Sequence, residues 1–515
     1  MDSAALKSSY EVVPYESRPI TVTHPDRIAA IVALYGLAAP PLESCRVLEL
    51  GCASGGNLIP MASGLPGGTF VGVDFAEGQV AAGRAMIERL GLTNVRLETM
   101  SIADIDDALG EFDYIICHGV YSWVPPEVQA ATLRVCSRNL APHGVAYVSY
   151  NTYPGWHLRG LAQDMVRFHD DPALTADARA ERGRAFVQFV ADSAPPHHRR
   201  YADLLRDELV TLKSETTSHF LHEQLELTNQ PVYFEEFARR AGDVGLQYIA
   251  EAQPSALASA ISDEARAAIR AWSGDLVRFE QYLDFLRLRT FRQTLLCHQG
   301  LALRPDPMPD ALLGLHVAGR ADPVGGDTVA GTRSFRSAEG VTVTTNNPIA
   351  IAALDTLHAI RPKTLPFRGL WSAVRGALAS SPARYEELSL DDPLTLAAPL
   401  LQCVLGRLVE VHARERRVVA EAGDRPAATT LARLQAPTAQ LVTNLRHVPV
   451  ELDPLDRFVL ERLDGLRDRA TLLADLRQAT ARDLVRGDPR LVTDDLEQVL
   501  DYSLKRLAQA ALIEA

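Results

Sequence analysis

Residues 47–57 read VLELGCASGGN, and this stretch decides the fold. Its apolar beginning is typical of a buried strand, and the strand carries an acidic residue, Glu49, near its end. The chain then turns through Gly51 and Gly55 before a helical pattern starts. Glycines allow a tight turn and a close approach of the backbone to a ligand, and the start of the following helix offers free N–H groups. The stretch therefore predicts a strand, a turn and a helix that together bind a ligand.

Short apolar runs separated by amphipathic helical patterns continue through the first 170 residues and return twice before residue 300. Apolar runs of this length between helices are typical of a sheet that is buried on both faces. We therefore predict an α/β fold with a Rossmann-like, seven-stranded sheet. Its strands are expected at residues 45–51, 69–75, 95–101, 112–118, 144–150, 246–252 and 291–298.

The rest of the chain divides into an insertion and two smaller units. Residues 171–240 carry helical patterns without a strand signal, so we expect a helical insertion before the last two strands. A proline-rich linker at residues 303–314 follows the sheet, and further on Asn347 and Pro348 predict the start of a helix. The last 65 residues predict helices, the final one with an apolar stripe. The expected domains are residues 1–300, 301–420 and 421–515.

The composition excludes several classes of protein. The 515 residues carry a formal net charge of −13, from 52 basic and 65 acidic residues, and only four of the basic residues are lysine. An acidic, lysine-poor chain is a poor match for a phosphate backbone, so we expect no nucleic-acid partner. No run of about 18 apolar residues occurs, so we expect no membrane insertion. The six cysteines have no CxxC or zinc spacing, which predicts reduced thiols, a cytoplasmic protein and no metal site.

Asp74 ends the second predicted strand, where a carboxylate can bind the hydroxyl groups of a ribose. Two nucleoside cofactors fit this layout. A dinucleotide prefers glycine in the middle of the turn, where this chain has Ala53, and Glu49 would repel its pyrophosphate. S-adenosylmethionine has no phosphate and carries a sulfonium and an ammonium group, which suit an acidic residue. The residues therefore favour S-adenosylmethionine over a dinucleotide.

Aromatic residues gather after the fourth and fifth predicted strands, where a ligand crevice is expected. The segments CHGVYSWVPP (117–126) and SYNTYPGWHLRG (149–160) hold two of the four tryptophans. Aromatic faces stabilise a sulfonium or an ammonium group, and a histidine there can act as a general base or line the adenosine pocket. The catalytic candidates are His118, Tyr121, Trp123, Asn151 and Tyr153.

These segments carry a specific resemblance. The chain resembles the bacterial class I S-adenosylmethionine-dependent methyltransferases with a methyltransferase regulatory domain, which include the rickettsial-type protein-lysine methyltransferases. The resemblance covers the catalytic domain and the insertion, and it is looser beyond residue 300, where that family has paired winged-helix-like α+β domains. The matching stretches are SYEVVPY (9–15), THPDR (23–27), VLELGCASGGNLIPMA (47–62), FDYIICHGVYSWVPP (112–126), AYVSYNTYPGWHLRG (146–160), FLHEQLELTNQPVYFEEF (220–237), GLQYIAEAQPS (245–255) and EQYLDFLRLRTFRQTLLCHQ (280–299).

The resemblance implies the class I methyltransferase fold, a regulatory or dimerising role for the insertion, and a homodimer. It also implies that an N-terminal segment folds over the cofactor. One departure is Ala53-Ser54, where the family commonly has Gly-Asp, and alanine fits there if its φ is negative. The residues implied to bind S-adenosylmethionine are Tyr10, Tyr15, Glu49, Gly51, Ala53, Gly55, Asn57, Asp74, Phe75, Ser101, Ile102 and His118.

Three functions fit these observations. In the first, the chain N-methylates lysine side chains of a protein or peptide by in-line displacement, and Tyr121, Asn151 and Tyr153 orient the amine and help to remove its proton. In the second, it methylates a small molecule at nitrogen, oxygen or carbon, and the C-terminal domains cap the site or build a dimer. In the third, which is not enzymatic, the C-terminal domains read DNA, and the acidic charge disfavours this. We expect the first.

Overall fold

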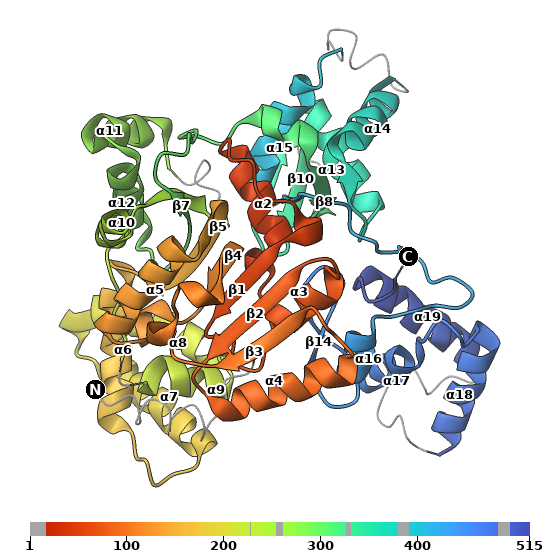
Figure 1. Cartoon of the computed structure of the whole chain (residues 1–515), viewed down its shortest axis with the longest axis horizontal. Helices are drawn as coiled ribbons and strands as arrows, with labels where there is room; N and C mark the ends of the chain where they lie inside the picture. Colours follow the sequence, from red (N-terminus) through yellow and green to blue (C-terminus); the bar gives the residue numbers. More distant parts are fainter. Residues whose placement is uncertain are drawn as a thin grey trace.

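The computed structural model describes residues 17–226, 228–253, 261–325, 331–379, 391–482 and 495–514. Its largest sheet has seven strands in the order β3-β2-β1-β4-β5-β7-β6, with helices packed around it (Figure 1). All seven predicted strands form, and the predicted Rossmann-like α/β fold is confirmed. The strands are β1 (Arg46–Leu50), β2 (Thr69–Asp74), β3 (Val95–Thr99), β4 (Phe112–Cys117), β5 (Leu140–Asn151), β6 (Leu246–Glu251) and β7 (Phe291–His298).

Neighbouring residues of the central strand belong to opposite layers of the core. Val47 lies in the apolar cluster that contains residues of α2 (Pro25–Leu34) and α3 (Leu58–Gly64), whereas Leu48 lies in the cluster that contains residues of α5 (Pro126–Arg138). Side chains alternate across a strand, so a sheet buried on both faces needs apolar residues at every position. The strands therefore read as continuous apolar runs rather than as an alternating pattern.

The direction in which the strands are added to the sheet reverses between β1 and β4. β1 pairs in parallel with β2 on one side and with β4 on the other. In sheets of this kind a ligand crevice lies outside the carboxyl ends of the strands at the reversal. α3 and α4 (Glu77–Leu90) start just after β1 and β2, so the glycine turn and Asp74 both lie at this edge. β7 runs antiparallel to β5 and β6 and completes the other half of the sheet.

A group of helices is inserted between β5 and β6. It begins with α6 (Gly155–His169), so residues 155–160, which the sequence places in a crevice loop, instead start a helix. The helices bury their own apolar cluster, which includes Val166, Leu209 and Phe220. The other inserted elements are α7 (Ala176–Ser193), α8 (Arg199–Ser214), α9 (Thr217–Phe220), the π-helical turn η7 (Leu221–Leu225) and α10 (Phe234–Asp243).

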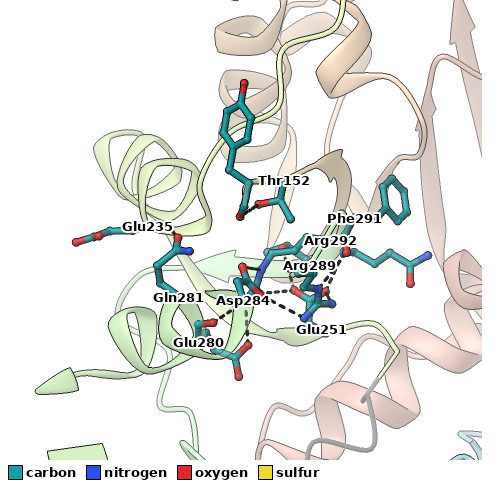
Figure 2. A network of polar contacts seen from close by, with 12 residues as sticks. Thr152, Glu235, Glu251, Glu280, Gln281, Asp284, Arg289, Phe291 and Arg292 are labelled. Carbon is teal, nitrogen blue, oxygen red and sulfur yellow. Dashed lines mark hydrogen bonds and ion pairs between the residues drawn. The ribbon is translucent and has the colours of Figure 1, made fainter. Parts of the chain in front are cut away.

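A cluster of buried charges joins the edge of the sheet to α12 (Leu276–Arg287), the helix that follows α11 (Asp263–Ser273) and precedes β7 (Figure 2). Arg292 on β7 is fully buried and donates to Asp284 of α12 at 2.7 Å and to Glu251 of β6 at 2.8 Å. Arg289 forms a second ion pair with Glu251 at 2.6 Å. The cluster therefore connects two strands and a helix through one buried guanidinium group.

The middle part of the chain forms small antiparallel sheets with helices around them. Residues 316–319 and 342–345 form strands, and the Oδ1 of Asn347 caps its helix as predicted, accepting from the N–H groups of Ile349 and Ala350. The sequence patterns missed β9 and β10. The elements are η8 (Pro309–Gly314), β8 (His316–Gly319), β9 (Ala321–Val324), β10 (Arg333–Ser337), β11 (Thr342–Thr345), α13 (Pro348–Ala359), β12 (Leu365–Pro366), α14 (Phe367–Ala379), α15 (Leu394–Leu405) and β13 (Val409–His412).

The C-terminal part combines a two-stranded sheet with helices, in the predicted winged-helix arrangement. Leu500, Leu504 and Leu507 of the final helix are buried in its core, as the apolar stripe predicts. Figure 1 shows these elements in blue, on the side of the molecule opposite the inserted helices. They are α16 (Thr430–Gln435), β14 (Leu441–Thr443), β15 (Pro449–Glu451), α17 (Pro454–Arg462), α18 (Arg469–Ala481) and α19 (Leu496–Gln509).

Three further features concern the whole of the described chain. None of its helices combines the length and apolar character needed to cross a membrane. The six cysteines are all buried and free of disulfide bonds. No group of histidine, cysteine, aspartate and glutamate side chains in the described residues is arranged to hold a metal ion.

Candidate active site

The turn after β1 forms because two glycines adopt backbone conformations that other residues avoid. Gly51 has a φ of 74° and Gly55 a φ of 76°, both in the left-handed region. A Cβ atom at Gly51 would also lie 2.4 Å from Cγ2 of Val120, so close packing adds to the backbone requirement. The N–H groups of Gly51 and Cys52 both donate to the carbonyl of Val73 on β2, which ties the turn to the neighbouring strand.

Ala53 does not meet the condition stated for alanine from the sequence. Its φ is 47° and not negative, so alanine occupies a left-handed position. This conformation costs a residue with a Cβ atom about 1–2 kcal/mol. The N–H of Ala53 donates to Oδ2 of Asp74 at 2.8 Å, and this hydrogen bond helps to hold the turn in place.

The carboxylate of Asp74 lies beside the turn at the end of β2. Besides Ala53, it accepts from the N–H of Ala76 at 2.9 Å. Burial raises the pKa of Asp74, although these backbone hydrogen bonds act in the opposite direction. A carboxylate offers about four lone-pair sites, so Asp74 can still accept hydrogen bonds from the hydroxyl groups of a ribose.

Glu49 lies on β1, close to the same turn. Nδ2 of Asn57 donates to its Oε1 at 2.7 Å, whereas its Oε2 is buried without a hydrogen-bond partner among the described residues. Burial raises the pKa of Glu49 to about 8. A buried carboxylate oxygen without a partner is unfavourable, and a ligand that brings a donor or a cation relieves this. The ammonium group of S-adenosylmethionine is such a donor, so the site fits this cofactor.

Asn57 connects Glu49 to two distant parts of the chain. Its Oδ1 accepts from the backbone N–H of Ile20 and from Nε2 of His447, each at 2.8 Å. His447 is buried in the C-terminal part, 390 positions away in the sequence. Burial lowers the pKa of His447 to about 3, so its ring is neutral at physiological pH. Sequence reasoning missed His447, because no local pattern signals a contact over that separation.

Glu49, Asn57 and Asp74 line a cavity of about 520 Å³, a volume within the usual range for a small-molecule site. Gly55 does not line it, and a Cβ atom there would lie 3.0 Å from Ile59 and 3.2 Å from Leu97, so Gly55 serves the packing of the turn. The predicted cofactor-binding residues that line the cavity are Glu49, Gly51, Ala53, Asn57, Asp74, Phe75, Ser101, Ile102 and His118.

The N-terminal segment also reaches the cavity. Tyr10 and Tyr15 lie outside the described residues, but Ser17 and Arg18, which follow them, line the cavity. Oγ of Ser17 accepts from the N–H of Gly56 at 2.7 Å, so the segment is hydrogen-bonded to the glycine turn. Arg18 is the one arginine among the described lining residues and can pair with the carboxylate of a ligand. Sequence reasoning missed Arg18.

The structure brings two of the five catalytic candidates, His118 and Trp123, to the cavity. Tyr121 lies between them in the chain, on the 3-10 helix η5 (Tyr121–Trp123), but its ring is fully buried and does not line the cavity. The ring packs edge-to-face on Phe237 of the inserted segment, with centroids 5.3 Å apart. The tight helical turn points successive side chains in different directions, which the spacing of aromatic residues in a sequence does not reveal.

Asn151 and Tyr153 also lie outside the cavity lining. Nδ2 of Asn151 donates to Oδ1 of Asn229 at 3.0 Å, so this amide supports the inserted segment. The ring of Tyr153 stacks on His157, with centroids 4.1 Å apart. Both residues pack between the sheet and the inserted helices.

His118 faces the cavity with one side of its ring held by the sheet. Its Nδ1 lies 2.8 Å from the hydroxyl of Tyr147, and it packs edge-to-face on Phe291. Burial lowers the pKa of His118 to about 4, and the charge of Arg18 acts in the same direction. The ring is therefore neutral at physiological pH and adds no positive charge to a site that fits a cationic cofactor.

Side chains of the inserted segment complete the cavity. His219 comes from α9, His222 and Glu223 come from η7, and Thr228 follows them. Sequence reasoning gave these residues no role, although His222, Glu223 and Thr228 lie in a stretch that carries part of the family resemblance. The cavity therefore lies between the glycine turn after β1, which we call the cofactor turn, and the insertion.

Comparison with family models assigns three parts of the chain. A methyltransferase domain matches residues 47–144, and a predicted methyltransferase regulatory domain matches residues 216–298. The C-terminal winged helix domain described for PKMT matches residues 424–512. The first match contains the glycine turn and Asp74, and the second contains Glu223.

Two individual proteins resemble the chain over most of its length, and a third resembles it over almost half. The uncharacterised protein RP789 of Rickettsia prowazekii is 32% identical over 486 residues, which cover 92% of this chain and 86% of that protein. Protein RP028 of the same organism is 38% identical over 235 residues, 46% of this chain and 94% of that protein. The structure of PKMT2 from Rickettsia typhi superimposes with a TM-score of 0.84 at 27% identity, covering 97% of this chain and all of PKMT2. PKMT2 has also been solved in complex with S-adenosylhomocysteine, with the same degree of similarity.

Proposed function

We propose that this chain transfers the methyl group to lysine side chains. The chain belongs to the family of S-adenosylmethionine-dependent methyltransferases that carry a methyltransferase regulatory domain and a C-terminal winged helix domain. The observation that carries the proposal is the likeness to PKMT2, a protein lysine methyltransferase by its name, over 97% of this chain. This likeness includes the inserted helices and the winged helix, which lie outside the cofactor-binding strands.

The charge of the cavity supports a basic acceptor. Five acidic residues line the cavity, against the single Arg18 among the described lining residues: Glu49, Asp74, Asp104, Glu127 and Glu223. Carboxylates attract the ammonium group of lysine, and desolvation inside the cavity lowers the pKa of that group. Trp123 also lines the cavity and provides an aromatic surface for the cationic side chain.

The residues around the cavity would have separate roles in binding the cofactor. When bound, S-adenosylmethionine supplies a methyl group on a positively charged sulfur. Glu49 would accept from its ammonium group, Asp74 from its ribose, and Arg18 would pair with its carboxylate. The protein then accelerates the transfer mainly by positioning the amine and by excluding water, and positioning alone contributes about 7–11 kcal/mol in favourable cases.

A labelling experiment tests the acceptor. The enzyme is incubated with S-adenosylmethionine carrying a tritiated methyl group and a dialysed bacterial protein extract, and the labelled protein is hydrolysed to amino acids. We expect the label in methylated lysine. Label in another amino acid would contradict the lysine acceptor. Label recovered only after addition of the small-molecule fraction would favour the alternative, a small-molecule methyltransferase.

The proposal extends to assembly, location and domain limits. Phe168, Phe189 and Val210 are 86%, 63% and 72% exposed on three neighbouring inserted helices, which supports a homodimer through this face. Light scattering should then report a dimer for the wild type and a monomer for Phe189→Asp.

The six buried free thiols support a cytoplasmic location, and the net charge of −13 supports the absence of a nucleic-acid partner. We propose domain limits at residues 300 and 420.

A further inference from the structure

Glu223 stands out among the residues that the insertion brings to the cavity. It lies in the π-helical turn η7, and its side chain lines the cavity. Its Oε2 is buried and has no hydrogen-bond partner among the described residues. Short π-helical turns are rare and occur frequently at functional sites. A buried carboxylate oxygen without a partner, on a residue that lines a cavity, calls for a donor from a ligand.

The other acids of the cavity do not suit the methyl acceptor. Glu49 and Asp74 lie on the cofactor turn and its neighbouring strand, where S-adenosylmethionine is expected. Asp104 and Glu127 line the cavity but are exposed to solvent. The segment after β4, residues 118–125, approaches the cavity without any acidic residue. Glu223 is therefore the acid of the described lining that has a buried carboxylate oxygen and that the cofactor does not use.

A chain of hydrogen bonds connects the backbone of Glu223 to the end of β5. Its carbonyl accepts from Nε2 of Gln163 at 2.7 Å, and Oε1 of Gln163 accepts from Asn229 at 3.4 Å. Oδ1 of Asn229 accepts in turn from Asn151 at 3.0 Å. Asn151, a catalytic candidate from the sequence, thus supports the segment that carries Glu223.

The electrostatic surroundings leave Glu223 able to exchange a proton near neutral pH. Burial raises the pKa of Glu223 to about 7, and the charge of Arg159 on α6 partly opposes this. Glu215 and Glu208 act with burial to raise it, and both form ion pairs with Arg159. The titratable neighbours from its own segment that line the same cavity are His219 and His222.

We propose that Glu223 binds the amine of the methyl acceptor and removes its proton before methyl transfer, an assignment that rests on the lysine acceptor proposed above. The ammonium group of lysine gives one proton to the carboxylate of Glu223, and the nitrogen regains its lone pair. That lone pair then forms the N–C bond to the methyl group while the C–S bond breaks and its electron pair stays on sulfur. The positive charge passes from sulfur to nitrogen. A regulatory-domain residue therefore supplies the acid–base chemistry of the catalytic site.

The test compares Glu223→Gln with Glu215→Gln, which makes the same chemical change at a nearby acid whose side chain is buried outside the cavity lining. The readouts are the initial rate of tritium transfer into methyllysine of the protein extract and the affinity for S-adenosylhomocysteine by calorimetry. We expect Glu223→Gln to lose roughly 10²–10⁴-fold in rate, the usual contribution of a general base, with the affinity within about twofold of wild type. Glu215→Gln should keep its rate within about threefold of wild type, because Glu215 contacts neighbouring side chains and takes no part in the reaction.

A second variant separates chemistry from folding. In Glu223→Ala, added acetate should restore part of the lost rate, since a small carboxylate can occupy the vacated position, and acetate should not accelerate the wild type. Label in methyllysine with an unchanged rate in Glu223→Gln would overturn the role of Glu223 and leave the lysine acceptor standing. An equal loss in both glutamine variants, without acetate rescue, would also overturn it. Label absent from lysine in the wild type would overturn the lysine acceptor and, with it, this role for Glu223.

Discussion

Glu251 and Glu49 are both buried in the seven-stranded sheet, but their surroundings differ. At the β6–β7 edge, Glu251 accepts from Arg292, Arg289 and the N–H of Gln293. At the end of β1, Glu49 has one oxygen bound to Asn57 and one without a partner among the described residues. Burial acts to raise the pKa of both carboxyl groups. The two arginines outweigh burial at Glu251 and lower its pKa, whereas at Glu49 burial prevails and raises the pKa to about 8.

The difference shows how one residue type serves architecture in one region and binding in another. A buried acid whose oxygens are all paired is part of the fold, because its charge is already compensated by the protein. A buried acid with an unpaired oxygen beside a cavity is incomplete until a ligand arrives. Glu49 and Glu223 are of the second kind. Glu49 comes from the sheet and Glu223 from the insertion, and both line the same cavity.

The largest effect is expected at the paired cluster. Arg292→Met leaves Glu251 and Asp284 buried with too little positive charge, and we expect a loss of about 3–5 kcal/mol in the free energy of unfolding. Urea denaturation measures it. Arg239→Met is the matched control, because Arg239 forms ion pairs with Glu236 and Asp243 at the surface. If both variants unfold at the same urea concentration, the cluster around Arg292 does not hold the fold together.

At the unpaired acid, the expected effect is on binding and depends on pH. With a pKa of about 8 in the free protein, Glu49 carries a proton below that pH, and a bound ammonium group favours its charged form. Binding of S-adenosylhomocysteine should therefore release a proton, and its affinity should rise with pH by up to about tenfold per unit between pH 6 and 7.5. Calorimetry in buffers of different ionisation enthalpy measures both. Glu49→Gln should bind more weakly and show no such slope, and a slope that survives in this variant would contradict the assignment.

A smaller effect is expected from the distant contact to Asn57. His447→Ala removes one of the donors at Oδ1 of Asn57 and should weaken S-adenosylhomocysteine binding by roughly two- to tenfold, the usual net value of one hydrogen bond, about 0.5–1.5 kcal/mol. His447→Gln retains an N–H donor and should recover part of the affinity. A variant that melts earlier but binds the ligand with wild-type affinity would show that His447 supports the interface between domains and not the cofactor site.

The smallest effect is expected at Ala53. Glycine relieves the cost of the left-handed φ of 47°, but it also gives the unfolded chain more freedom, and the two contributions oppose each other. Ala53→Gly should therefore stabilise the protein by less than about 1 kcal/mol, as measured by thermal unfolding. A clear destabilisation would mean that the methyl group of Ala53 makes a contact more valuable than the strain it causes.

Local patterns predicted much of the fold. The seven strands, the glycine turn, the cap at Asn347 and the stripe of the last helix all follow from neighbours in the sequence, because periodicity and capping act over a few residues. The patterns missed β9, β10 and α6, whose formation depends on strands and helices that the local sequence does not contain. Val166 of α6, for instance, is buried in a cluster with Leu209 of α8 and Phe220 of α9.

The candidate site also combines residues that local patterns predicted with residues that only tertiary packing brings together. The sequence by itself determined that Glu49, the turn from Gly51 to Asn57, and Asp74 meet at one edge of the sheet, because each directly follows or ends a parallel strand. Only the tertiary structure decided that Tyr121 turns into the core, that His447 reaches Asn57 across 390 positions, and that Glu223 faces the same cavity. These contacts depend on how whole elements pack, and packing is set by distant side chains that no local pattern records.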